Sequence, residues 1–224
     1  MPRMKNTFSA ARLVAATLVA GLALTLAGCS ILPKAAPDPT RHYVLAAPVV
    51  DSAATPATDT PARGSLKVGL RTVRAAAYLD GVALIVRRGD NEIDHRDYAR
   101  WAEPLSVGVG RILRLRLQDA APVARLLPQP FPFDVVRDVD VEVTVLRAEA
   151  AQLADGRRVV SFVCTYEIIR AVEGAGAGEL LVRETYVAPE TPWREGDYAG
   201  LAHALGVAAD ALAVRIAERL SSVE

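Results

Sequence analysis

The sequence predicts an α+β domain in which two amphipathic helices pack on one face of a mainly antiparallel sheet of about six strands. Several segments alternate apolar and polar residues, a pattern typical of half-buried strands. Two longer segments repeat apolar residues at helical spacing. The strands come in runs and do not alternate strictly with helices, which favours an α+β arrangement over a parallel α/β fold.

The first strands are predicted from short apolar or alternating segments. Residues 66–72 alternate apolar with polar side chains, residues 41–45 form a shorter candidate, and residues 81–88 are more fully apolar. Residues 92–96 form a weaker strand candidate. Between the last two segments, Arg87–Asn91 contains turn-forming residues, so a hairpin is expected there.

Two helices are predicted from apolar stripes. The first carries Leu105, Val109, Ile112, Leu113 and Leu117 on one side. Pro104 lies at its start, where the missing N–H is tolerated. The second helix is expected over residues 197–220 and closes the chain.

Three further strands are predicted between these helices. Valines at 139, 141, 143 and 145 alternate with Asp140, Glu142 and Thr144. A second apolar row runs from 160 to 168, and a third strand is expected over 179–188. Asp155-Gly156 is a hairpin turn signal between the first two.

The N-terminus has the parts of a secretory signal. Arg3, Lys5 and Arg12 form a basic leader, and an apolar run follows from Leu13 to Gly28. This run is shorter than the roughly 20 residues that a membrane-spanning helix needs. Its length therefore argues against an uncleaved anchor helix.

The end of this leader resembles the lipobox of bacterial lipoprotein precursors. Leu26-Ala27-Gly28-Cys29 implies cleavage between Gly28 and Cys29, with a diacylglyceryl group on the thiol and an N-acyl chain on the new terminus. Several acyl chains together hold a protein on a membrane, whereas one chain binds only reversibly. Ser30 follows the cysteine, where an Asp is the familiar inner-membrane retention signal. We therefore expect a lipid-anchored protein on the periplasmic face of the outer membrane.

Three parts of the chain follow from these patterns. Residues 1–28 are the signal peptide; residues 29–65 hold the lipidated Cys and a flexible tether and loop that include the short strand 41–45. Residues 66–224 form the single α+β domain. The chain has 26 basic and 26 acidic residues, and loss of the basic leader leaves it slightly acidic. A nucleic-acid partner is therefore not expected.

No pattern of catalytic or cofactor-binding residues is recognised. His42, His95 and His203 lie on different predicted elements, and none forms a metal-binding pair. The Gly-x-Ser-x-Gly nucleophile motif does not occur. Cys164 lies in an apolar segment and is interpreted as a small core residue. We expect no enzyme activity, no catalytic residues, no metal and no cofactor other than the covalent lipid on Cys29.

Two short motifs resemble the ABC-transporter auxiliary lipoproteins of the PqiC type. The first is Tyr78-Leu79-Asp80, and the second is Trp101-Ala102-Glu103-Pro104, which leads into a helix containing Arg111. The resemblance extends over nearly the whole mature chain, although only these motifs are distinctive. The sequence departs from the family where Gly81 stands in place of an Arg.

The resemblance implies a non-enzymatic subunit of an MCE-type lipid transport system. Such an outer-membrane lipoprotein, often a homo-oligomeric ring, docks a periplasmic MCE-domain protein, and an ABC permease completes some systems. The alternative function is a periplasmic ligand-binding lipoprotein that shields an apolar molecule, although the aromatic content of 5% gives it little support.

The motif residues are the candidates for interaction with a partner, and each has a structural alternative. Trp101, beside Glu103 and Pro104, is either a core residue under the helix or an interface anchor. The segment Tyr78-Leu79-Asp80 is either a turn between strands or an exposed loop that touches a neighbouring subunit.

Replacing Trp101 with Ala separates its alternatives. If the indole is a core residue, Trp101→Ala unfolds or strongly destabilises the domain. If it is an interface residue, the variant stays folded and assembles less well. Circular dichroism and size-exclusion chromatography measure the two outcomes, and a folded variant with unchanged assembly would contradict the interface hypothesis.

Overall fold

Ten strands and two α-helices build the part of the chain that the computed structural model describes, which is residues 36–46, 64–172 and 178–223. The elements in chain order are β1 (Arg41–Tyr43), β2 (Leu66–Leu70), β3 (Arg74–Ala75), the 3-10 helix η2 (Ala77–Leu79), β4 (Ala83–Arg88), β5 (Glu92–Trp101), α2 (Leu105–Leu117), β6 (Val123–Pro128), β7 (Val139–Gln152), β8 (Arg158–Arg170), β9 (Leu180–Val187), β10 (Thr191–Pro192) and α3 (Tyr198–Ser221). All belong to the unit Thr40–Glu224, which is separate from Met1–Pro39. The signal peptide and Cys29 lie outside the described residues.

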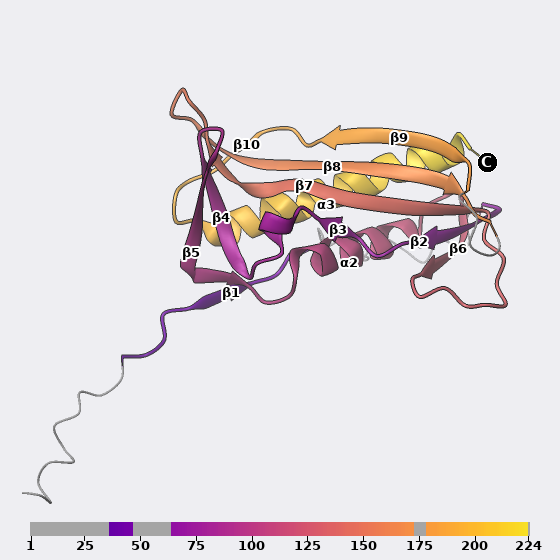
Figure 1. Cartoon of the computed structure of the whole chain (residues 1–224), viewed down its shortest axis with the longest axis horizontal. Helices are drawn as coiled ribbons and strands as arrows, with labels where there is room; N and C mark the ends of the chain where they lie inside the picture. The colour runs from indigo at the N-terminus through magenta and orange to yellow at the C-terminus, as the bar shows by residue number, and fades with distance from the viewer. Residues whose placement is uncertain (1–35, 47–63, 173–177, 224) are drawn as a thin grey trace, which may run out of the picture. The chain divides into compact units, whose positions relative to one another are not determined.

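Strand β7 is the centre of the sheet. One of its edges pairs with β8 along its whole length. Its other edge pairs first with β2, then with β3 and then with β4, and each of these strands is parallel to β7. β2 also pairs with β6, β4 pairs with β5, and β8 pairs with β9 and β10. Figure 1 shows β7, β8 and β9 running side by side.

The prediction of a mainly antiparallel sheet of about six strands was wrong. The sheet is mixed, and five of the nine pairings in the described residues are parallel. Helix α2 crosses over between β5 and β6, so the chain returns to the end of the sheet at which β2 began. β6 therefore runs in the same direction as β2, and residues 129–138 then return along β2, so that β7 also runs in this direction.

The two expected hairpins are present. β4 and β5 are joined at a turn in which Gly89 has φ 58°, and β7 and β8 are joined at a turn in which Gly156 has φ 85°. These left-handed conformations favour glycine because it has no Cβ. The residues of each turn were therefore enough to predict these two antiparallel pairs.

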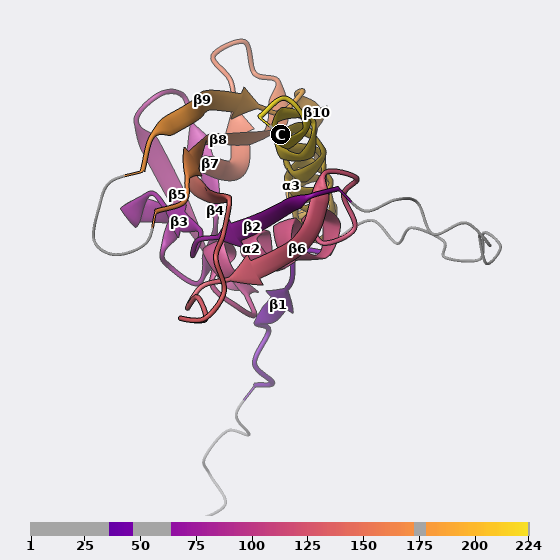
Figure 2. The same cartoon turned by 90° about the vertical axis from the view of Figure 1, so that its right-hand side faces the viewer.

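The two helices pack on one side of the sheet and against each other. Both views of the fold place α2 and α3 on the same side of β7 and β8 (Figures 1 and 2). The apolar rows of the strands and the helical stripes meet there and form one core, whose largest fully buried side chains are Leu45, Leu84, Ile112, Leu113, Leu117, Phe162, Tyr166, Ile168, Leu201, Leu205, Leu212 and Ile216. The opposite side of the sheet carries the Asp140, Glu142 and Glu149 side chains of β7.

Helix α3 begins at a well-formed cap. The Asp197 carboxylate accepts a hydrogen bond of 2.8 Å from the Gly200 N–H, and the Trp193 indole donates to the Asp197 carbonyl at 2.8 Å. Trp193 is itself buried. In the described part of the chain, α3 is the one helix with the length and hydropathy of a membrane span, and core helices of soluble proteins share these properties. Its apolar stripe faces the domain core.

Two glycines in the helices differ in the space around them, which gives a matched test of the packing. A Cβ at Gly206 would overlap the backbone carbonyl of Ala46, so Gly206→Ala forces the segment after β1 away from α3. A Cβ at Gly110 would lie 3.5 Å from Val73 Cγ2, an ordinary contact. We expect Gly206→Ala to lower the free energy of unfolding, and Gly110→Ala to raise it by about 0.5–1 kcal/mol.

Urea denaturation of the two variants measures both changes. Equal stabilisation by both substitutions would contradict the close contact between α3 and Ala46.

Candidate docking surface

Tyr78 lies in a polar cluster at the outer side of β7. Its hydroxyl is 2.8 Å from Glu149 Oε2 and 2.9 Å from the Leu146 carbonyl oxygen. Arg87 Nε donates to Glu149 Oε1 at 2.5 Å, and the Arg87 guanidinium lies 5.4 Å from the centre of the Tyr78 ring. Elements η2, β4 and β7 therefore meet at one buried carboxylate.

The Glu149 carboxylate has no exposed surface, so its charge depends on these partners. Burial raises the pKa of Tyr78 to about 12, and the hydrogen bond to Glu149 raises it in the same direction. The phenol therefore remains protonated at neutral pH and acts as a hydrogen-bond donor. The cluster holds the Tyr78-Leu79-Asp80 turn on β7.

The three residues of this turn differ in exposure. Tyr78 is half-buried, the Leu79 side chain is buried in the core, and Asp80 is exposed. Asp80 ends η2, with its N–H donating to the Ala77 carbonyl at 3.2 Å. The following Val82 is 53% exposed. Asp80 and Val82 are thus available to a partner, whereas Leu79 is not.

Trp101 ends β5, and its side chain is 7% exposed. Its backbone pairs with Tyr43 of β1, and its N–H donates to the Val82 carbonyl at 2.6 Å. This position favours the core alternative for the indole. The backbone bond also brings the two sequence motifs together, because Val82 directly follows the Asp80–Gly81 turn.

Glu103 and Pro104 shape the start of α2. Pro104 is the N-cap residue, and its carbonyl accepts from the Gly108 N–H at 3.1 Å. The Glu103 carboxylate accepts a 2.6 Å hydrogen bond from Arg111 Nη2, which also donates to the Leu45 carbonyl at 2.8 Å. Glu103 and Arg111 therefore tie the helix start to the segment after β1. Glu103 is half-buried, and Pro104 is exposed.

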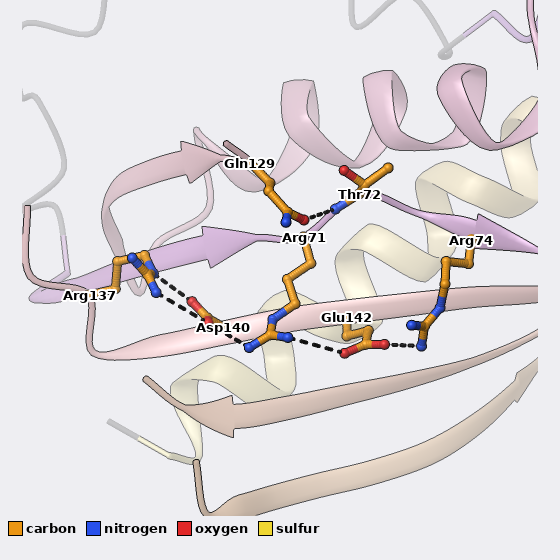
Figure 3. A network of polar contacts seen from close by, with 7 residues as sticks. All are labelled: Arg71, Thr72, Arg74, Gln129, Arg137, Asp140 and Glu142. Carbon is orange, nitrogen blue, oxygen red and sulfur yellow. Dashed lines mark hydrogen bonds and ion pairs between the residues drawn. The ribbon is translucent and has the colours of Figure 1, made fainter. Parts of the chain in front are cut away.

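The outer face of β7 also holds a row of ion pairs, drawn in Figure 3. Arg137 Nε donates to Asp140 Oδ1 at 2.7 Å, and Arg71 Nη2 donates to Asp140 Oδ2 at 3.1 Å. Glu142 lies between Arg71, at 3.8 Å, and Arg74, which it contacts directly. The pairs of Arg71 and Arg74 join β3 and the residues before it to β7. The alternation of acids with valines separated Asp140 and Glu142 from the valine row, but it could not name their arginine partners.

The side-chain amide of Gln129 also binds the residues between β2 and β3. The Thr72 N–H donates to Gln129 Oε1 at 3.0 Å (Figure 3). The Gln129 N–H donates to the Leu70 carbonyl at 3.0 Å. Gln129 also begins the loop from 129 to 137, which lines a surface hollow of about 510 Å³ together with Ala171 and Val172. Sequence reasoning did not single out this loop, although its repeated Pro-Phe pairs were visible.

The histidines lie apart on β1, β5 and α3, and each is exposed. Within the described residues, no group of three or more His, Cys, Asp or Glu side chains is placed to hold a metal ion. The geometry of the outer face therefore consists of neutralised ion pairs and exposed turns.

A family model described as "ABC-type transport auxiliary lipoprotein component" matches residues 43–217. The chain belongs to this family. The match begins at the last residue of β1 and ends in α3, so it includes both sequence motifs, all the ion pairs of Figure 3 and strands β2 to β10. The predicted resemblance is confirmed.

Solved structures share the fold of this auxiliary lipoprotein at low sequence identity. A Xanthomonas campestris protein of the DUF330 family is 16% identical, with a TM-score of 0.62 over 80% of this chain and 93% of its own. An uncharacterised protein is 16% identical, with a TM-score of 0.57 over 81% and 98%. PelC of Paraburkholderia phytofirmans, a dodecamer, has a TM-score of 0.36, too low to transfer its assembly. A comparison with curated proteins finds no match.

The Glu149 cluster of the auxiliary lipoprotein gives a stability prediction. Glu149→Gln removes the charge that balances Arg87 and is expected to lower the free energy of unfolding by roughly 3–5 kcal/mol. Tyr78→Phe removes one hydrogen bond and leaves the ion pair, so its expected cost is about 0.5–1.5 kcal/mol. Chemical denaturation checks both, and equal effects would show that Arg87 does not depend on Glu149.

Because Trp101 is buried, we expect Trp101→Ala to have the effect predicted for a core residue. Trp101→Ala leaves a cavity between β5 and the core and should lower the free energy of unfolding by about 3–5 kcal/mol.

Proposed function

We propose that this auxiliary lipoprotein is an outer-membrane subunit of an MCE-type lipid transport system and docks to a periplasmic MCE-domain protein. The observation that carries the proposal is the family match over residues 43–217. The lipobox at Leu26–Cys29 supports membrane anchoring, and Ser30 supports the outer membrane. In this proposal an ABC permease energises transport elsewhere in the system, and the lipoprotein acts by protein contact, as a homo-oligomeric ring.

The structural features of the domain fit docking better than ligand storage. A protein that shields an apolar molecule needs an enclosed, mostly apolar pocket. The described hollows of about 510, 290 and 350 Å³ are open to the surface. The space between the helices and the sheet is filled by packed side chains. The alternative of a ligand-binding lipoprotein therefore has less support.

The exposed turn Asp80–Val82 is the proposed contact with the MCE protein. Two contacts hold it in place: the hydrogen bond from the Tyr78 hydroxyl to Glu149, and the hydrogen bond from the Trp101 N–H to the Val82 carbonyl. A turn fixed in this way loses little conformational freedom when it binds, which favours affinity. The buried motif residues would then act by shaping the turn.

Affinity purification from native cells tests the docking role. The detergent-solubilised lipoprotein is expected to recover an MCE-domain protein, identified by mass spectrometry. Asp80→Arg should lower this recovery, whereas Asp90→Arg, in the exposed β4–β5 turn, serves as the matched control and should not. Recovery of the lipoprotein alone, even after crosslinking, would overturn the proposal.

Lipid attachment has its own test. Cys29→Ser should abolish incorporation of a labelled palmitate analogue and leave the leader uncleaved, because the modified thiol is required before cleavage. Cys164→Ser is the control and should be labelled like the wild type, since Cys164 is buried. Labelling of the Cys29→Ser protein would contradict the assigned anchor.

A further inference from the structure

An exposed aromatic residue stands at the tip of the loop after β6. The Phe133 side chain is fully exposed, follows Pro132 and precedes Asp134. The base of the loop is held, because Phe131 lies under the Arg137 guanidinium at 3.9 Å and Arg137 is bound to Asp140. A large apolar side chain presented on a fixed loop is a frequent mark of an interaction site.

An open socket lies beside the start of α2. It has a volume of about 290 Å³ and is lined by Leu70, Val73, Val107 and Gly110, with arginines on its rim. This volume lies at the lower limit of small-molecule sites, roughly 300 Å³, and suits a single side chain. Phe133 of the same chain does not fill it, because that side chain is fully exposed.

The rim of the socket has a free positive charge. Arg71 is bound by Asp140 and Glu142, and Arg111 is bound by Glu103. Arg114 also lines the socket, and it forms no ion pair with any residue that the structure describes. The socket therefore suits an apolar side chain that is next to an acidic one.

We propose that Phe133 of one copy of this chain fills the socket of a second copy and that Asp134 pairs there with Arg114. The inference rests on the proposed function, which anchors many copies in one membrane. Asp134 forms no ion pair in the described part of its own chain, so both charges are available. Phe133 and Asp134 are consecutive in the loop, and Arg114 lines the apolar socket, so the two surfaces are complementary in both apolar character and charge.

A contact of this kind needs at least two copies of the chain. The Phe133 loop and the socket adjoin, since Gln129 lines both hollows, so the contact is compatible with a reciprocal pair about a two-fold axis as well as with repetition from one copy to the next. Lipid anchoring confines all copies to one membrane and so raises their local concentration. The site is incomplete without the neighbouring copy.

Disulfide trapping in native membranes tests the contact with the full-length protein. One tagged copy carries Phe133→Cys, and a second, differently tagged copy carries Val107→Cys, a 52% exposed position on the socket. The native Cys164 does not interfere, since burial raises its pKa to about 12. We expect a disulfide-linked pair of the two copies after mild oxidation. Phe133→Cys with Tyr98→Cys, an exposed position on β5, is the control and should not crosslink.

A charge exchange tests the polar part of the contact. Arg114→Asp and Asp134→Arg should each lower the crosslinking yield about fivefold or more, because each places like charges together. Both substitutions in one chain should restore the yield. Reversals that are not rescued by their combination would overturn the pairing.

Two further outcomes would overturn the proposal. One is the absence of a crosslink between Phe133→Cys and Val107→Cys copies. The other is a disulfide formed within a single chain that carries both substitutions, which would mean that the loop closes on its own socket. Recovery of an MCE-domain protein is measured separately with the unmodified chain, so failure of this contact is distinguished from failure of the proposed function.

Discussion

Hydrogen bonding along both edges of β7 is the constraint on which the rest of the domain depends. One edge carries β8, and the other carries β2, β3 and β4 in succession. The valine row of β7 turns toward α2 and α3, so the same strand also organises the core. Its outward carboxylates, Asp140, Glu142 and Glu149, then bind cationic groups from the segments paired with it.

These outward ion pairs explain how the exposed features are held in place. Arg71 and Arg74 fix the segment between β2 and β3, while Arg87 and Tyr78 fix the turn that ends at Asp80. The partly exposed pairs of Arg71 and Arg74 with Glu142 contribute only about 0–1 kcal/mol each, so their main effect is on geometry, whereas breaking the buried Arg87–Glu149 pair is strongly destabilising. The domain thereby presents preformed turns and loops on the sheet, which suits the proposed docking role.

Sequence reasoning succeeded where structure is set by nearby residues. Apolar spacing placed both helices, and glycine-containing turns placed both hairpins. It failed on strand direction, because the parallel pairs depend on the crossover through α2 and on contacts between distant segments. The ion-pair partners of Asp140 were hidden for the same reason. The two alternatives for Trp101 also required tertiary structure, since an aromatic residue before a helix fits either a core or a surface.

Amide hydrogen exchange, resolved by mass spectrometry of overlapping peptides, tests most directly the claim that β7 organises this domain. Amide groups of a central strand, which has a hydrogen-bonded strand on each side, exchange only when the whole domain unfolds. Amide groups of an edge strand also exchange through local opening. We predict the slowest exchange for β7, with faster exchange in β9, which among the described strands pairs with β8 alone. Exchange of β7 amides as fast as those of β9 would contradict the account, because the sheet would then open without unfolding the core.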